Sequence, residues 1–172
     1  METFDSIEKR VIVRAPIARV WRAISTAREF GSWFGMDLDG EFVVGKPIMG
    51  TFNVALNEAV IRDYQRKLGL APSKVKLPDK ALVFCTVERI EPEGYFSFRW
   101  IPYGIDAEVD PETEPTTLVE FRLATVAEGT LLTIVESGFE RVPAHRRERA
   151  FRMNEAGWAG QAQNIRNYSE KQ

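Results

Sequence analysis

The sequence predicts an α+β fold, in which a curved antiparallel sheet packs against a single long C-terminal helix. Strand-like segments follow one another between residues 82 and 137, joined by two tight turns and one longer loop, which favours antiparallel pairing. A helical pattern then runs from about residue 143 to 168, with Phe151, Trp158 and Ile165 spaced seven apart near one stripe of the helix. This order of elements gathers the helices on one face of the sheet.

Length and composition suit one globular domain spanning residues 1–172. The chain is 44% hydrophobic, and a chain of this size buries about 70% of its unfolded surface, enough for a core with an internal cavity. A net charge of −2 and a pI near 5.6 argue against a nucleic-acid partner, since proteins that bind nucleic acids usually carry an excess of lysine and arginine. The sequence contains no run of about 18 apolar residues, the length that a membrane-spanning helix needs. The first residues lack a signal-peptide pattern, so a cytoplasmic location is expected.

The N-terminal elements are predicted to be one strand and two helices. Residues 7–15 alternate between apolar and charged side chains, as in a strand with one solvated face. Pro16 suits the first turn of a helix, whose apolar residues recur at helical spacing up to Ile24. A short second helix is expected to reach Phe30, before a corner at residues 31–35.

Glycines punctuate the next stretch and indicate short strands near 41–45 and 48–56. Residues 57–80 are predicted to form a helix-containing insertion, because apolar residues at helical spacing are followed by Gly69, which suits the end of a helix. The stretch from Pro72 to Pro78 is typical of a linker. Two roles remain open for the insertion: a lid over a pocket, or a surface ornament, which is the favoured interpretation.

Alternating and apolar runs predict four further strands, at residues 82–90, 95–101, 117–126 and 130–137. Glu93-Gly94 and Glu128-Gly129 suit tight hairpins. The segment from Gly104 to Pro115 carries five acidic residues and no basic one. It is interpreted as a solvated hairpin loop rather than a cation site, since carboxylates in a mobile loop make poor pre-formed ligands.

Several motifs, in the correct order, resemble the START-like (SRPBCC) superfamily. They are Ile7–Ile24 followed by Trp33-Phe34-Gly35, then Phe96–Trp100, Glu136–Phe139 and Asn154–Trp158. Within the superfamily, they are similar to the branch named after the C-terminal domain of the activator of Hsp90 ATPase. The resemblance covers nearly the whole chain apart from the insertion at about 57–80.

The resemblance implies a helix-grip (START/Bet v 1-like) fold, with a curved sheet of about seven antiparallel strands wrapped around the long C-terminal helix and a hydrophobic cavity between them. Members of the superfamily include lipid and hormone carriers and polyketide cyclases. Some relatives carry the label of a vanillate demethylase subunit. That label is not transferred, because the chain has no flavin, iron–sulfur or dinucleotide-binding signature. No cofactor is expected.

The residue types used in nucleophilic and metal catalysis are scarce. The one histidine, His145, has arginines around it at the start of the long helix and is expected at the surface. The one cysteine, Cys85, lies in an apolar run and is expected to be a buried small hydrophobe. One histidine and one cysteine cannot supply the usual metal ligands. No catalytic residue and no metal site are therefore predicted.

Aromatic side chains with two polar residues form the candidate binding site, as in typical small-molecule pockets. The candidate contacts are Trp33, Phe34, Phe98, Trp100, Phe121, Glu136, Phe151, Asn154 and Trp158. Any single ring is also explained by core packing. Asn154 lies one turn from Phe151 and Trp158 on the same helix face, where a buried amide needs a partner. That partner is a ligand, Glu136 or a backbone group.

We therefore expect a binding protein that holds a small hydrophobic or aromatic molecule between the sheet and the C-terminal helix. One alternative is a protein-interaction module with a chaperone partner, as the branch name suggests. A further alternative is an enzyme of cyclase or lyase type that uses a buried carboxylate or Tyr103. A homodimer is compatible with a small domain, and nothing in the sequence demands one.

Overall fold

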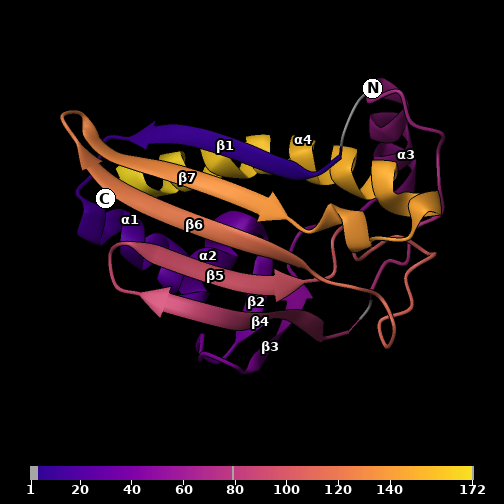
Figure 1. The fold of residues 1–172 in the computed structure, drawn as a ribbon, viewed down its shortest axis with the longest axis horizontal. Coiled ribbons are helices and arrows are strands. Elements are labelled where there is room, and N and C mark those ends of the chain that lie inside the picture. Colours follow the sequence, from indigo (N-terminus) through magenta and orange to yellow (C-terminus); the bar gives the residue numbers. More distant parts are fainter. Residues whose placement is uncertain (1–3, 79, 172) are drawn as a thin grey trace.

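The computed structural model describes residues 4–78 and 80–171 and has the predicted α+β helix-grip fold (Figure 1). One antiparallel sheet contains the strands in the order β1-β7-β6-β5-β4-β3-β2. The strands are β1 (Ser6–Val13), β2 (Met36–Asp39), β3 (Pro47–Phe52), β4 (Leu82–Glu91), β5 (Tyr95–Trp100), β6 (Thr117–Val126) and β7 (Gly129–Ser137). The helices are α1 (Ile17–Ser25), α2 (Ala27–Phe34), α3 (Glu58–Lys67), a 3-10 turn (Phe139–Arg141) and α4 (Ala144–Glu170).

The helix α4 lies along one face of the sheet, and α1 and α2 pack beside it on that face (Figure 1). The predicted stripe is confirmed, since Phe151, Trp158 and Ile165 are all buried against the sheet. The small residues Gly157 and Gly160 of the same helix are exposed, so they do not lie between the helix and the sheet.

The strand predicted near 41–45 is wrong. The strand β2 lies earlier, at Met36–Asp39, and pairs with β3, which is shorter than the predicted range of 48–56. Gly40 and Gly45 explain the error, because both have positive φ (97° and 80°), a backbone conformation that ends a strand. The intervening residues form the connection between β2 and β3.

The second helix, α2, continues to Phe34 rather than ending near Phe30. It stops at Gly35, whose left-handed conformation (φ 99°) and N–H bond to Gly31 O form a helix C-cap. The longer helix brings Phe34 to the end of the sheet, beside Phe84 and Trp100.

Alternation along β7 places one carboxylate in the core. Thr130, Leu132, Ile134 and Glu136 are the buried residues of this strand, and all lie on the face that packs against α4. The strand ends at Gly138, whose φ of 102° favours glycine and turns the chain away from the sheet. The side chain of Glu136 is therefore held at the last core-facing position of β7.

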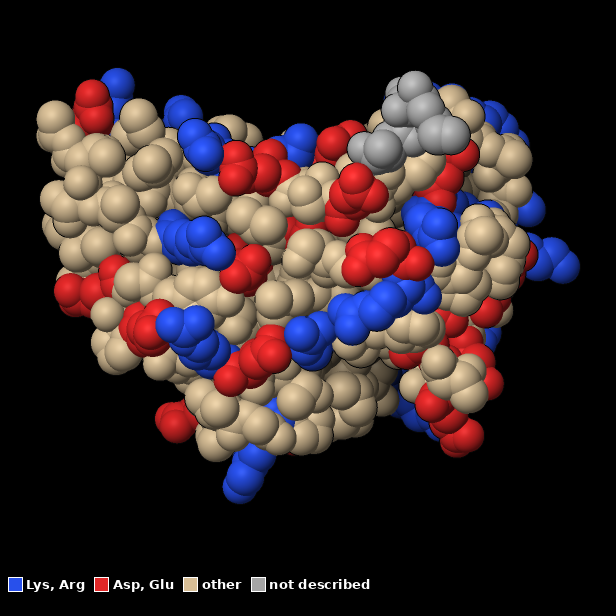
Figure 2. Space-filling model, in the orientation of Figure 1, with Lys and Arg blue, Asp and Glu red and all other residues tan. Residues whose placement is uncertain are grey.

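The opposite face of the sheet is solvated and carries both signs of charge (Figure 2). Ion pairs lie on this face both between strands, as in Glu88–Arg99 (3.3 Å), and within one strand, as in Glu120–Arg122 (3.2 Å). Such exposed pairs contribute little to stability. In the part of the chain that the structure describes, no helix is long and apolar enough to cross a bilayer.

Candidate functional site

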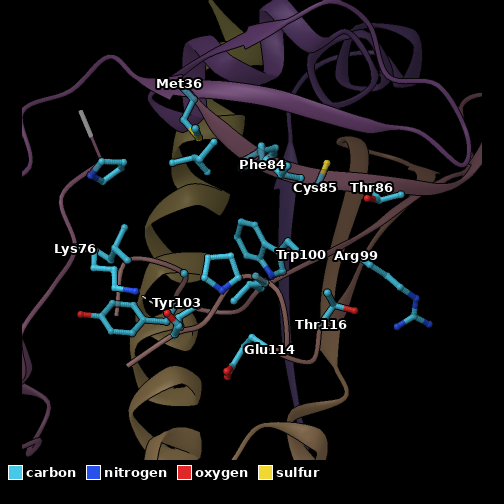
Figure 3. Close-up of a pocket in the computed structure, with 18 of the residues that line it drawn as sticks. Met36, Lys76, Phe84, Cys85, Thr86, Arg99, Trp100, Tyr103, Glu114 and Thr116 are labelled. Atoms are coloured by element: carbon cyan, nitrogen blue, oxygen red, sulfur yellow. Dashed lines mark hydrogen bonds between the residues drawn. The ribbon is translucent and has the colours of Figure 1, made fainter. Parts of the chain in front are cut away.

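A cavity of about 700 Å³ opens at the end of the sheet, where β4 begins and β5 ends (Figure 3). The ends of α2 and β3 form part of its wall, and the loops around residues 76–78 and 101–116 form the rest. Most of its lining is apolar, from residues that include Phe34, Met36, Phe52, Leu82, Phe84, Trp100, Ile101, Ile105 and Val109. From α4, only Asn154 contributes among the described residues.

The two loops that form the outer wall are joined by backbone hydrogen bonds, which we name the cross-loop bridge. Residues 74–76 face residues 105–107 in it, through the isolated bridge Val75–Asp106 and the bond from Lys76 N to Ile105 O (2.6 Å). Ala107 N donates to Lys74 O (3.1 Å). The end of the insertion therefore takes part in the cavity wall.

Buried charges anchor the second of these loops to α4. The Arg146 side chain is fully buried and donates to Glu114 Oε1 (2.6 Å), Asp106 Oδ2 (3.4 Å) and Pro102 O (2.7 Å). Arg149 donates to the same Asp106 oxygen at 2.8 Å. The interpretation of residues 104–115 as a solvated loop is therefore wrong for Asp106, which is fully buried, and for Glu114, whose side chain is 6% exposed.

The predicted site residues occupy three kinds of position. Phe34, Trp100 and Asn154 line the cavity. Glu136 lies behind the wall, in contact with Trp100 and Asn154. The remaining five, which do not line the cavity, are Trp33, Phe98, Phe121, Phe151 and Trp158.

Rings fill the space beneath the middle of α4. Trp158 packs on Phe121 (5.8 Å between ring centroids) and on Trp100 (5.5 Å). Trp33 bonds to Ala23 O, and Phe151 packs on Phe139. Ring contacts through Phe30 join Trp33 to Phe121 and Trp158, and Phe151 belongs to the same hydrophobic core. The cavity expected between the sheet and the C-terminal helix is therefore not found beneath the middle of α4. It lies at the end of the sheet, where Phe34 and Trp100 are part of its wall.

Glu136 is fully buried and accepts hydrogen bonds from four neutral groups. The donors are Trp100 Nε1 (2.7 Å to Oε2), Thr117 Oγ1 (2.6 Å to Oε2), Trp158 Nε1 (2.9 Å to Oε1) and Asn154 Nδ2 (3.0 and 3.1 Å to the two oxygens). Strand pairing brings them together, because Trp100 faces Thr117 across β5 and β6. The partner that Asn154 was expected to need is therefore Glu136.

Burial raises the pKa of Glu136 above its ordinary value of 4.5, and the four hydrogen bonds oppose that rise. The folded state thus keeps the carboxyl proton to a higher pH than the unfolded state. Because the folded state binds more protons from about pH 4.5 up to its raised pKa, the contribution of Glu136 to the free energy of unfolding falls as pH rises through that window.

We expect the stability advantage of the wild type over Glu136→Gln to narrow as pH rises from 4.5. The variant carries no titrating group at this position, so the difference between the two profiles isolates Glu136. Urea denaturation of both proteins across the pH range measures it. An advantage that widens with rising pH would mean that the pKa of Glu136 is depressed.

The other side chains of types used in catalysis lack the environment that would activate them. Burial raises the pKa of the Cys85 thiol to about 12, so the thiolate is scarce at neutral pH. Burial also raises the pKa of the Tyr103 phenol, whose oxygen accepts a bond from Gln65 Nε2 (3.0 Å). The His145 side chain is 62% exposed, in agreement with the sequence. Within residues 4–78 and 80–171, no group of three or more potential metal ligands is found.

Two features of the site escaped sequence reasoning. The first is Lys76, which lay in a presumed linker and lines the cavity. The second is the buried charge cluster around Arg146. A signal for it existed, since five acidic residues within 104–115 match four arginines between residues 146 and 152. Complementary clusters of this kind are candidates for tertiary ion pairs.

Comparisons with known proteins support the fold. No protein-family model matches the sequence, and no curated protein is significantly similar to it. Protein MLL2253 from Mesorhizobium loti has 19% identity and a TM-score of 0.66, over 96% of this chain and 97% of that one. The Aha1 dimer from Colwellia psychrerythraea has 17% identity and a TM-score of 0.61, over 96% of each chain. DynU16, from the dynemicin biosynthetic locus, has 22% identity and a TM-score of 0.61, over 95% of this chain and 46% of that one.

Proposed function

We propose that this protein binds a small apolar or aromatic molecule in the cavity at the end of the sheet. The observation that carries the proposal is the cavity itself, with its volume of about 700 Å³ and its aromatic floor of Phe34, Phe84 and Trp100. Small-molecule sites in proteins typically have volumes of about 300–1,000 Å³ and a mainly apolar lining with a few polar groups. Asn154 is a polar residue that borders the cavity, and its bond to Glu136 fixes the orientation of its amide.

Binding explains the site better than catalysis does. Glu136 is fully buried and is not among the cavity-lining residues, and its oxygens accept hydrogen bonds from Trp100 and Asn154, which do line the cavity. Cys85 does line the cavity, but a thiol with a pKa of about 12 is a poor nucleophile at neutral pH. A general acid or base must reach its substrate within hydrogen-bonding distance. Tyr103 also lines the cavity, but burial raises the pKa of its phenol, and its oxygen already accepts a hydrogen bond from Gln65. We therefore do not favour the cyclase or lyase alternative.

The chaperone partner and the homodimer stay predictions. Similarity to the Colwellia Aha1 dimer at 17% identity carries the fold alone. An exposed apolar patch on a protein without any cavity would have favoured an interaction module. The cavity instead favours a small-molecule ligand.

Blocking the cavity tests the proposal. Thr116 is half-buried and lines the cavity (Figure 3), so a tryptophan at this position occupies ligand space. We expect Thr116→Trp to raise the Kd of N-phenyl-1-naphthylamine, a neutral aromatic dye, by about tenfold or more, equivalent to a loss of about 1.4 kcal/mol. Fluorescence titration measures the Kd, because the dye brightens in apolar surroundings.

The matched control is Thr133→Trp. Thr133 is half-buried on β7, pairs with Arg10 and Arg122 in neighbouring strands, and is not among the cavity-lining residues. The Kd of the dye for Thr133→Trp should stay within about twofold of the wild-type value. A wild-type protein that does not bind the dye, or a Thr116→Trp variant that binds it unchanged, would refute the cavity as the site.

A further inference from the structure

We propose that the ligand is a small aromatic carboxylate, whose ring system occupies the apolar cavity and whose anionic group pairs with the ammonium of Lys76. This inference rests on the proposed function and specifies the class of ligand. It follows from the charged side chains in the cavity wall. Among the described residues, Lys76 is the one of them that has no oppositely charged partner.

The ammonium of Lys76 is held in place by a neutral group. Its Nζ donates to the backbone oxygen of Val109 (2.7 Å), a buried residue that also lines the cavity. Figure 3 shows this side chain directed toward the interior of the cavity, on the same side as Tyr103. An ammonium has three N–H donors, so two remain for a ligand.

The other charges of the wall are already neutralised. Glu114 accepts from Arg146 at 2.6 Å, and its side chain is 6% exposed. Arg99 pairs with Glu88 at 3.3 Å, and its guanidinium points away from the other labelled side chains in Figure 3. Among the described residues that line the cavity, Lys76 is therefore the charged side chain that a ligand can complement.

The backbone fixes where this charge lies. Lys76 N donates to Ile105 O within the cross-loop bridge, so the residue is tied to the opposite loop on both its main-chain and side-chain nitrogens. A charge held in this way costs less conformational entropy on binding than a free lysine does. Because Lys76 is exposed at the mouth of the cavity, solvent screens it, and we expect a selectivity of several-fold rather than several hundred-fold.

The aromatic part of the assignment follows from the rings around the cavity. Phe34, Phe52, Phe84, Trp100 and Tyr103 all contribute to its lining. Aromatic rings gain from stacked or edge-to-face contacts beyond the area that they bury. A planar ring system therefore matches the cavity better than a flexible chain of equal size.

The test is competition against N-phenyl-1-naphthylamine by two molecules of similar size, 2-naphthoate and the neutral 2-naphthalenemethanol. We expect the wild type to bind 2-naphthoate about fivefold more tightly than the alcohol, and Lys76→Met to abolish that preference. Lys76→Arg should retain it, because the charge remains. The matched control Lys67→Met, at an exposed residue of α3 that does not line the cavity, should behave as the wild type.

The outcomes separate this inference from the proposed function. Failure of the wild type to bind the dye would overturn both. Dye binding without a preference for 2-naphthoate, or a preference that survives in Lys76→Met, would overturn the ligand class alone. If Lys76→Met loses the dye together with 2-naphthoate, Lys76 shapes the wall rather than recognising an anion, and the inference fails. Higher salt should reduce the preference of the wild type.

Discussion

Replacing Glu136 with glutamine is expected to lower the free energy of unfolding by about 2–4 kcal/mol, although the two side chains have nearly the same shape. Each carboxylate oxygen accepts an indole N–H, from Trp158 on one side and Trp100 on the other. An indole nitrogen can only donate. Whichever way the glutamine amide turns, its NH₂ group therefore meets an indole N–H, and at least one buried donor loses its acceptor.

A protonated carboxyl group behaves differently from this amide. Its hydroxyl can donate to Thr117 Oγ1, which lies 2.6 Å away, and its oxygen still accepts from Trp100. The raised pKa of Glu136 and a destabilising Glu136→Gln substitution are thus compatible.

Glu120→Gln is the control for this substitution. Glu120 lies on the solvated face of β6, where its Oε1 accepts from Tyr95 and Arg122, so its loss should cost no more than about 1 kcal/mol. Urea denaturation followed by circular dichroism gives both values. A Glu136→Gln protein within about 0.5 kcal/mol of the wild type would show that the indoles do not depend on this carboxylate.

Replacing Arg146 with methionine is expected to cost about 3–5 kcal/mol, because it leaves buried partners without a compensating charge. Glu114 would lose its ion pair, and Pro102 O would lose its donor. Asp106 would keep its ion pair with Arg149. The affected groups lie along the loop that closes the cavity, so weaker dye binding should accompany the loss of stability.

Arg147→Met is the matched control for Arg146→Met. Arg147 is adjacent but half-buried, and it donates to the backbone oxygens of Glu140 and Val142 rather than to a carboxylate. Its loss should cost about 1 kcal/mol. Amide hydrogen exchange at Lys76 and Ala107 reports the cross-loop bridge directly, and it should accelerate in Arg146→Met alone. Unchanged exchange in Arg146→Met would contradict the anchoring role.

The fold was predictable because its signals are local. The stripe of Phe151, Trp158 and Ile165 and the alternation in the strands follow from helix and strand periods, and they need no knowledge of neighbours. Residues 41–45, wrongly predicted as a strand, have no such periodic pattern, since a short apolar run with flanking glycines suits a turn as well as a strand.

The candidate site was less predictable because tertiary contacts build it. Phe34, Trp100 and Asn154 were expected at a pocket and line the cavity. The loops that complete the wall join residues about thirty positions apart through backbone atoms, which leave no mark on the side-chain pattern. The burial of Asp106 depends likewise on arginines about forty positions away, so composition alone suggested a solvated loop.

The most direct test of the proposed site uses the four tryptophan indoles as separate reporters. In a ¹⁵N-labelled protein, titration with unlabelled N-phenyl-1-naphthylamine should shift the Trp100 indole resonance and the Asn154 side-chain amide, since both residues border the cavity. The indole of Trp21, which lies outside the cavity lining, should stay in place. Saturable shifts centred on Trp100 would support the account, whereas shifts confined to Trp21, or none at saturating dye, would contradict it.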